Sequence, residues 1–330
     1  MKKLMTRFVA TIFATLWLAG PLASVALSQP KPTASATKVR LAIPSPSLSY
    51  LPIYVAVQRG FFARRGFEIE MIQMTPALST AALLSRAVDY TTVPSTVATA
   101  AARGAPMKVI AFTSVKLQHM LMSRPEFKSV TDLAGKRIGA SGFGNLPAYE
   151  IQILIDRYRL GSNTTIVPVA SSLDRLIAMQ RGTIDAAIVA APLDIKAEEM
   201  GLKRLMHMGT ILQIPQAGLT ATEEKLKKNR REVVEVMKAT IEGLDYTWAQ
   251  HNNVVEIIAK WVQLSQPQAA KAYDSVKDTF SRNGIPTDEQ SKAYIAMLTA
   301  TANLGAEPAA ASIFDFSVAV EATRELAGSR

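Results

Sequence analysis

The segment from Ser49 to Met71 constrains the fold more than any other part of this chain. A β-like run at residues 39–43 precedes it, followed by a loop rich in proline and serine. The segment itself, SYLPIYVAVQRGFFARRGFEIEM, contains a short apolar helix, an Arg-Gly turn and a second β-like run at 67–72. This order is typical of a βαβ unit. It predicts an open α/β sheet, in which ligands gather where strands end and helices begin.

The same alternation continues to about residue 215, in two successive series. The remaining strands are predicted at residues 89–93, 107–112, 137–140, 164–168, 186–189 and 203–207. Helices are predicted at residues 52–58, 77–85, 96–102, 147–159, 173–180 and 193–200. Two βαβ series in tandem predict two α/β lobes, each built on a parallel sheet.

Beyond residue 230 the pattern becomes that of amphipathic helices. Apolar side chains recur at spacings of three and four residues and predict one buried helix face, formed by Val233, Met237, Ile241, Leu244 and Trp248. Further helices are predicted at residues 254–262, 268–280 and 289–301. We expect the methionines and tryptophans of this region to belong to the core.

The first 28 residues have the charge order of an export signal. Lys2, Lys3 and Arg7 precede an apolar run at 8–18, and small residues then lead to a cleavage site after Ser28. The sequence predicts a signal peptide at 1–28, a disordered leader at 29–37 and a mature protein in the periplasm. The alternative is an uncleaved N-terminal anchor helix. A lipid anchor is excluded, because the chain contains no cysteine.

Composition favours a globular protein without covalent crosslinks. Hydrophobic residues make up 48% of the chain and charged residues 19%, and the length suffices for two lobes with their own cores. The absence of cysteine excludes disulfides, thiolate metal sites and cysteine nucleophiles. The net charge of +10 includes three basic signal residues, so the mature chain carries +7 and favours anionic ligands. We expect no nucleic-acid partner, because basic and aromatic residues do not alternate.

Four loops at predicted strand-to-helix junctions form the candidate ligand site, at residues 44–50, 93–96, 141–145 and 190–192. The first is dense in hydroxyls, and in the second Ser95 or Thr96 could cap the next helix. The third combines glycines with a helix start, where free N–H groups favour an anion or a polar atom. The candidate ligand-binding residues are Ser49, Tyr50, Ser95, Thr96, Thr113, Ser141, Gly142, Phe143, Gly144, Asn145 and Pro192.

Catalytic, metal and cofactor motifs are missing. The glycines at 142 and 144 lack the third glycine of a dinucleotide fingerprint, and there is no phosphate-binding GxxxxGK[ST] loop. The three histidines, His119, His207 and His251, lie outside HExxH and GxSxG contexts, and we interpret them as packing or surface residues. Asp185 is interpreted as a turn or capping residue. We therefore expect no catalytic residues, no metal and no cofactor.

Three phrases of the sequence resemble the nitrate/sulfonate/taurine-type substrate-binding proteins of ABC transporters, within the superfamily of thiamine-pyrimidine synthases. The first is LPIYVA at 51–56 followed by GFF at 60–62, the second is LAGKRIG at 133–139, and the third is IAMQRGTIDA at 177–186, ending at Pro192. One departure is Arg86, which stands where the family has a glycine before the third strand, and it puts the turn at that helix end in doubt.

The resemblance implies a type II periplasmic-binding fold, with two α/β lobes around a ligand cleft and a helical C-terminal part. Lobe 1 would comprise residues 38–115 and 214–330, lobe 2 residues 116–213, and the hinges would lie near 113–120 and 210–218. The implied function is capture of a small anionic or polar organic molecule, such as a sulfonate, nitrate or a carboxylate, for an ABC permease. We expect a monomer.

Other functions stay open on the sequence. A neutral aromatic heterocycle, such as a thiamine-precursor pyrimidine, could stack between Tyr50 and Phe143. An enzyme of the same superfamily is disfavoured, because the pyrimidine synthases carry a cysteine-rich motif that this chain lacks. A sensor subunit that presents its ligand to a membrane receptor would share both the fold and the signal.

Overall fold

The computed structural model describes residues 36–143 and 145–328. The expected signal peptide, nearly all of the expected leader and the candidate residue Gly144 lie outside the described residues. Within the described ranges, no helix combines the length and apolar character that a membrane crossing requires.

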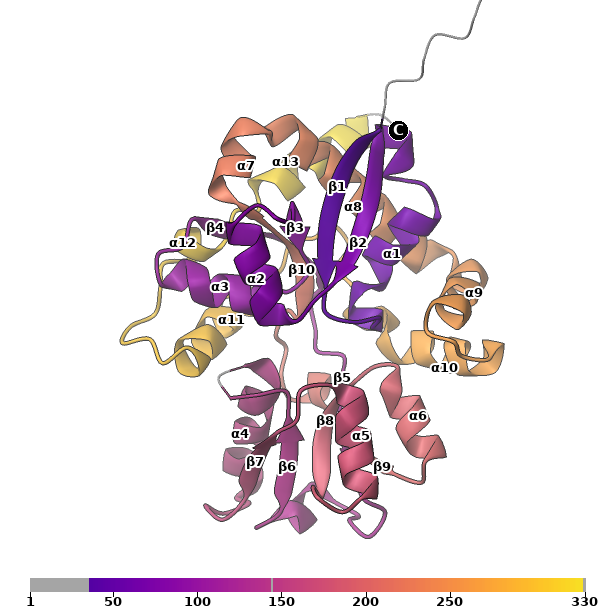
Figure 1. The fold of residues 1–330 in the computed structure, drawn as a ribbon, viewed down its shortest axis with the longest axis vertical. Helices are drawn as coiled ribbons and strands as arrows, with labels where there is room; N and C mark the ends of the chain where they lie inside the picture. The colour runs from indigo at the N-terminus through magenta and orange to yellow at the C-terminus, as the bar shows by residue number, and fades with distance from the viewer. Residues whose placement is uncertain (1–35, 144, 329–330) are drawn as a thin grey trace, which may run out of the picture. The chain divides into compact units, whose positions relative to one another are not determined.

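Lobe 1 is built on a five-stranded sheet of order β2-β1-β3-β10-β4 (Figure 1). Its strands are β1 (Thr37–Ile43), β2 (Phe67–Gln73), β3 (Tyr90–Thr91), β4 (Met107–Ser114) and β10 (Ala217–Thr222). β1 pairs in parallel with β2 and β3, and helix α1 (Leu51–Gln58) connects β1 to β2. The βαβ unit predicted at the start of the chain is therefore confirmed.

Lobe 2 is built on a second five-stranded sheet, of order β7-β6-β8-β5-β9. Its strands are β5 (His119–Ser123), β6 (Arg137–Ala140), β7 (Thr165–Pro168), β8 (Ala186–Ala190) and β9 (Lys203–His207). β6 is parallel to β7 and β8, whereas β5 is antiparallel to β8 and β9.

The prediction of two purely parallel sheets was wrong, because both sheets are mixed. β5 and β10 each follow a passage of the chain from one sheet to the other, and each enters its new sheet from the opposite direction. Neither strand was predicted. Every residue of both is buried, so neither alternates apolar and polar residues, and neither contains the valine and isoleucine of the buried strands β4 and β8.

Helices cover both sheets, and proline sets several of their starts. Pro52, Pro76, Pro94 and Pro147 each stand in the first turn of a helix, where a missing N–H costs no intrahelical bond. The helices after α1 are α2 (Pro76–Leu84), α3 (Pro94–Ala102), α4 (Leu146–Tyr158), α5 (Ser172–Gln180), α6 (Leu193–Glu199), α7 (Glu223–Lys228), α8 (Arg230–Ala249), α9 (His251–Trp261), α10 (Gln266–Val276), α11 (Asp288–Thr301), α12 (Ala310–Ile313) and α13 (Ser317–Gly328).

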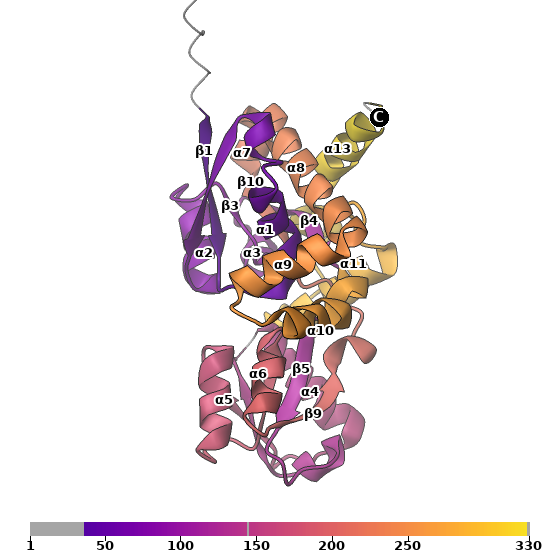
Figure 2. The same ribbon diagram turned by 90° about the vertical axis from the view of Figure 1, so that its right-hand side faces the viewer.

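The chain passes between the two sheets twice, from β4 to β5 and from β9 to β10. Apolar contacts also join the lobes. Tyr294 and Leu298 of α11 belong to the same core cluster as Ile151 and Leu154 of α4. On the other side, Ala191 and Ile195 of lobe 2 pack into a cluster with residues of α9 and α10. Figure 2 shows these two helices at the lower edge of lobe 1.

Arg86 forms the turn at the end of α2, at the position where the family that the sequence resembles has a glycine. Its φ is 64°, a left-handed conformation that is uncommon for residues other than glycine. Its backbone oxygen accepts a hydrogen bond from Arg40 at 3.0 Å, and its guanidinium pairs with Glu224. The turn is therefore kept, with side-chain contacts that a glycine could not make.

Candidate functional site

The hydroxyl-rich first loop of lobe 1 meets the end of strand β8 in lobe 2. Ser47 Oγ donates to the backbone oxygen of Ala191 at 3.0 Å, and the N–H of Leu48 donates to the same oxygen at 3.2 Å. Ser49, which is 1% exposed, donates from Oγ to Gln118 Oε1 at 3.4 Å. The structure thus brings together the predicted loops at 44–50 and 190–192, which come from opposite lobes.

Gln118 and Gln216 connect the two passages of the chain between the lobes. Gln118 N–H donates to Gln216 Oε1 at 2.6 Å, and Gln118 Nε2 donates to Thr279 Oγ1 at 2.7 Å and Ser114 Oγ at 3.3 Å. The sequence prediction missed both glutamines, because their partners lie far away in the chain. These bonds fix both passages relative to lobe 1.

His119, at the start of β5, extends this chain of hydrogen bonds into lobe 2. Its Nε2 lies 2.9 Å from Gln216 Nε2, and its Nδ1 lies 2.6 Å from Glu150 Oε1. Because Gln216 Oε1 already accepts from a backbone N–H, its Nε2 must be the donor to the ring. His119 Nε2 is then the acceptor, and Nδ1–H donates to the Glu150 carboxylate. The network assigns a neutral imidazole with its proton on Nδ1.

Arg175 links the segment that follows β7 to the middle of β8 in the lobe 2 sheet. It is only 4% exposed, and burial lowers the pKa of its guanidinium to about 10, against the opposing charges of Glu150 and Asp174. Its guanidinium donates to the backbone oxygens of Ile188, Val169 and Ala170 at 2.8, 2.7 and 3.2 Å and to Ser172 Oγ at 2.7 Å. With its donors directed at these acceptors, Arg175 acts as a structural cation of the site.

The loop predicted to anchor the ligand, residues 141–145, precedes α4. Asn145 Oδ1 accepts from the N–H of Ala148 at 3.2 Å, so Asn145 caps the helix and satisfies one of its free N–H groups. Phe143 is 71% exposed. Ser141 and Gly142 are partly exposed between β6 and this cap. The role of this loop in binding stays a prediction.

The predicted capping by Ser95 or Thr96 was wrong. The N-cap of α3 is Val93, without a side-chain bond. Thr96 Oγ1 instead accepts from Thr80 Oγ1 at 2.7 Å, which ties α3 to α2. Ser95 is partly exposed in the first turn of α3.

The remaining candidates, Tyr50, Thr113 and Pro192, lie at or near the lobe junction. Thr113 is fully buried near the end of β4, and its Oγ1 has no hydrogen-bond partner among the described residues. Tyr50 directly precedes α1, and burial raises the pKa of its hydroxyl well above the usual value. Pro192 is buried after a cis peptide bond and directly precedes α6.

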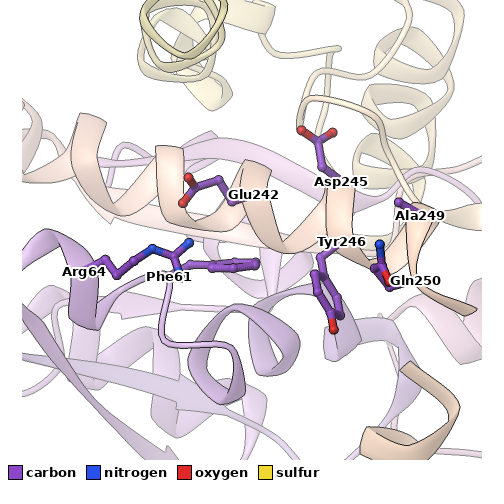
Figure 3. A pocket seen from close by; sticks show the side chains of 7 residues that line it. All are labelled: Phe61, Arg64, Glu242, Asp245, Tyr246, Ala249 and Gln250. Carbon is purple, nitrogen blue, oxygen red and sulfur yellow. The ribbon is translucent and has the colours of Figure 1, made fainter. Parts of the chain in front are cut away.

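A separate pocket of about 290 Å³ lies entirely on lobe 1 (Figure 3). It is lined by Phe61, Arg64, Glu242, Asp245, Tyr246, Ala249 and Gln250, none of which belongs to the four predicted loops. Arg64 lies over the ring of Phe61 at 4.5 Å and Arg59 over that of Tyr246 at 4.9 Å. One face of each ring is thus covered by a cation of the chain itself, and the pocket is distinct from the lobe junction.

The histidines and acidic residues form no metal site in the part of the chain that the structure describes. His207 pairs with Met120 on the neighbouring strand, and its Nδ1 accepts from the N–H of Gly209, whereas His251 is exposed near Asp274. Asp185 accepts hydrogen bonds from the backbone N–H of Arg137 at 2.9 Å and from its guanidinium at 3.1 and 3.0 Å. Asp185 therefore joins the starts of β6 and β8, and the interpretation as a turn or capping residue was wrong.

Solved structures of binding proteins share this fold. A ligand-binding component of an ABC-type import system from Staphylococcus aureus, solved with zinc bound, matches 87% of this chain and 99% of its own, with 14% identity and a TM-score of 0.74. The periplasmic nitrate-binding protein NrtA from Synechocystis PCC 6803 matches 88% and 89%, with 13% identity and a TM-score of 0.70. The periplasmic aliphatic sulphonate binding protein SsuA from Escherichia coli matches 82% and 87%, with 18% identity and a TM-score of 0.65.

Sequence comparison identifies the family. No curated protein gives a significant match to the chain. The family model described as NMT1/THI5 like matches residues 47–253, which is more than half of the 330 residues. The chain therefore belongs to the NMT1/THI5-like family.

Proposed function

We propose that this chain is an exported solute-binding protein that captures a small anionic or polar organic molecule between its lobes. It delivers this molecule, of a sulfonate, nitrate or carboxylate-like kind, to the permease of an ABC importer in the periplasm. The fold that it shares with binding components of import systems supports this role.

The observation that carries the proposal is the meeting of polar loops from the two lobes. Ser47, Ser49 and Gln118 form a hydrogen-bonded set that reaches from lobe 1 to the end of β8. Strand ends and helix starts in open α/β sheets are the usual places for ligands. A ligand bound here would contact both lobes and so favour their closed arrangement.

A hinged binding protein also needs contacts that form when its lobes approach. Lys271 of α10 pairs with Glu198 of α6 at 2.9 Å, and Gln268 of α10 is hydrogen-bonded to Glu199. These side chains are exposed, so each contact contributes little and breaks easily. Such weak polar contacts are compatible with repeated opening and closing.

The alternatives are capture of a neutral aromatic heterocycle and an enzymatic role within the same superfamily. A thermal-shift screen with alkanesulfonates, nitrate, aromatic carboxylates and aminopyrimidines distinguishes the ligand classes, because a ligand that binds only the native state raises the midpoint. Mass spectrometry of the bound compound then separates binding from turnover. Recovery of the unchanged compound supports the proposal, and a converted product contradicts it.

A further inference from the structure

Glu150 is a buried carboxylate with one oxygen unused by the protein. Its side chain is fully buried in the second turn of α4, and Oε1 receives the hydrogen bond from His119 Nδ1. Oε2 has no hydrogen-bond partner among the described residues. An unpaired buried acceptor costs free energy, and an ionised one costs more. A ligand group that donates a hydrogen bond to Oε2 would therefore gain binding free energy by pairing this acceptor.

Neither of the basic side chains near Glu150, His119 and Arg175, donates a hydrogen bond to Oε2. The ring of His119 is neutral and already donates to the other oxygen, by the network described above. Arg175 is near enough to attract Glu150, but its guanidinium is directed at backbone oxygens and at Ser172. Glu150 therefore has a nearby countercharge without a direct bond to it.

A further buried polar atom lies on the helix that packs against α4. The hydroxyl of Tyr294 of α11 also has no partner in the described part of the chain. Tyr294 shares a core cluster with Ile151 and Leu154 of α4. Unpartnered polar atoms on two helices that contact each other favour a polar ligand between them.

We propose that Glu150 is a ligand-binding residue that accepts a hydrogen bond from an N–H group, so that the ligand is a small organic molecule carrying an amine, an amidine or an amino-substituted ring. This inference rests on the proposed function and narrows its ligand class. Nitrate and simple alkanesulfonates carry no donor and leave Oε2 unpaired. Since α11 covers α4 in this structure, the ligand reaches Glu150 when the lobes separate.

The test uses matched pairs of probes, one with an amino group and one without it. Taurine and propane-1-sulfonate form one pair, and 4-aminobenzoate and 4-methylbenzoate form another, because a methyl group replaces the amino group in each. Calorimetry with the parent protein should show at least one amino probe binding about tenfold or more tightly than its methyl partner. Equal affinity within both pairs would overturn the inference.

Glu150→Gln supplies the residue-specific arm. The amide keeps an oxygen for His119 and places an N–H donor where Oε2 accepted. The affinity for the amino probe should therefore fall about tenfold or more, while the affinity for its methyl partner stays within about twofold of the parent value. Glu256→Gln, which removes the same charge from an exposed position on α9, is the control and should leave both affinities unchanged. Equal losses for both members of a pair would show that Glu150 acts only through the shape of the site.

A ligand-free arm separates this inference from the proposed function. If Oε2 has no structural partner, Glu150→Gln should keep its unfolding midpoint within about 2 °C of the parent. A fall of more than about 5 °C would overturn the inference, because Oε2 would then serve the fold. If no probe binds the parent, the proposed ligand classes fail, while the midpoint of Glu150→Gln still decides whether its carboxylate is free.

Discussion

Replacement of Arg175 by lysine tests whether one buried guanidinium links the segment after β7 to strand β8. The side chain is 4% exposed and makes four hydrogen bonds of 2.7–3.2 Å, two of them to backbone oxygens just after β7 and one to a backbone oxygen in the middle of β8. A lysine keeps the positive charge but offers one nitrogen, which cannot reach acceptors on several sides at once.

The expected loss follows from the acceptors left unpaired. We expect lysine to retain one or two of the four bonds. Each lost bond to a charged donor is worth about 1.5–3 kcal/mol, and relaxation of the strand ends recovers part of it. Arg175→Lys should therefore lower the free energy of unfolding by about 2–4 kcal/mol.

Urea unfolding followed by circular dichroism measures this difference, with the midpoint falling at an unchanged slope. Arg181→Lys is the matched control, since Arg181 lies at the exposed end of the same helix and should change stability by less than about 0.5 kcal/mol. Equal stability of Arg175→Lys and the parent would refute the assignment of Arg175 as the cation that holds these strands.

Three further outcomes are expected. Gly243→Ala should lower the free energy of unfolding by about 1–3 kcal/mol in urea, because the added Cβ would lie 2.3 Å from the backbone oxygen of Pro52. Gly305→Ala is the control, since a Cβ there meets open space and should leave stability nearly unchanged. Equal effects of the two variants would contradict the close packing at Gly243. Burial opposes ionisation of Asp185, but hydrogen bonds and attraction from Arg137 outweigh it and lower its pKa. Its contribution is thus complete above about pH 4 and disappears as the pH falls through the lowered native value, so the parent's stability advantage over Asp185→Asn should shrink below about pH 4 in an acid titration; a constant advantage would contradict the ion pair. Phe143→Ala should change the free energy of unfolding by less than about 0.5 kcal/mol, because Phe143 is 71% exposed. If the ring stacks on ligands, the same variant should bind 4-aminobenzoate more weakly in calorimetry. Unchanged affinity would remove Phe143 from the site.

The order of strands and helices was accessible from the sequence because it depends on local patterns. The boundaries of β6 and β9 are those predicted, and α4 differs from its prediction by one residue at each end. β5 and β10 were missed because they carry neither an alternating pattern nor the valine and isoleucine that mark the buried strands β4 and β8. Their antiparallel pairing depends on where the chain passes between the lobes, which no local pattern encodes.

The candidate site was predictable as a set of loops, but its polar network was not. The hydroxyls of the first loop follow directly from the sequence, whereas the bond between Gln118 and Gln216 joins residues 98 positions apart. One signal for Glu150 was present. It stands midway between Leu146 and Leu154 at a spacing of four residues, so the helix pattern places a carboxylate on the buried face of α4. A carboxylate buried on such a face needs a hydrogen-bond or charge partner.

Small-angle scattering across a ligand titration tests the central claim most directly, namely that the two lobes close on a small molecule. The probe is the compound that gives the largest thermal shift among the sulfonates, nitrate, carboxylates and amino compounds named above. The radius of gyration of the parent protein should fall as the probe saturates the site, because ligand contacts with both lobes favour the closed arrangement. An unchanged radius at a concentration where calorimetry shows full occupancy would contradict the claim.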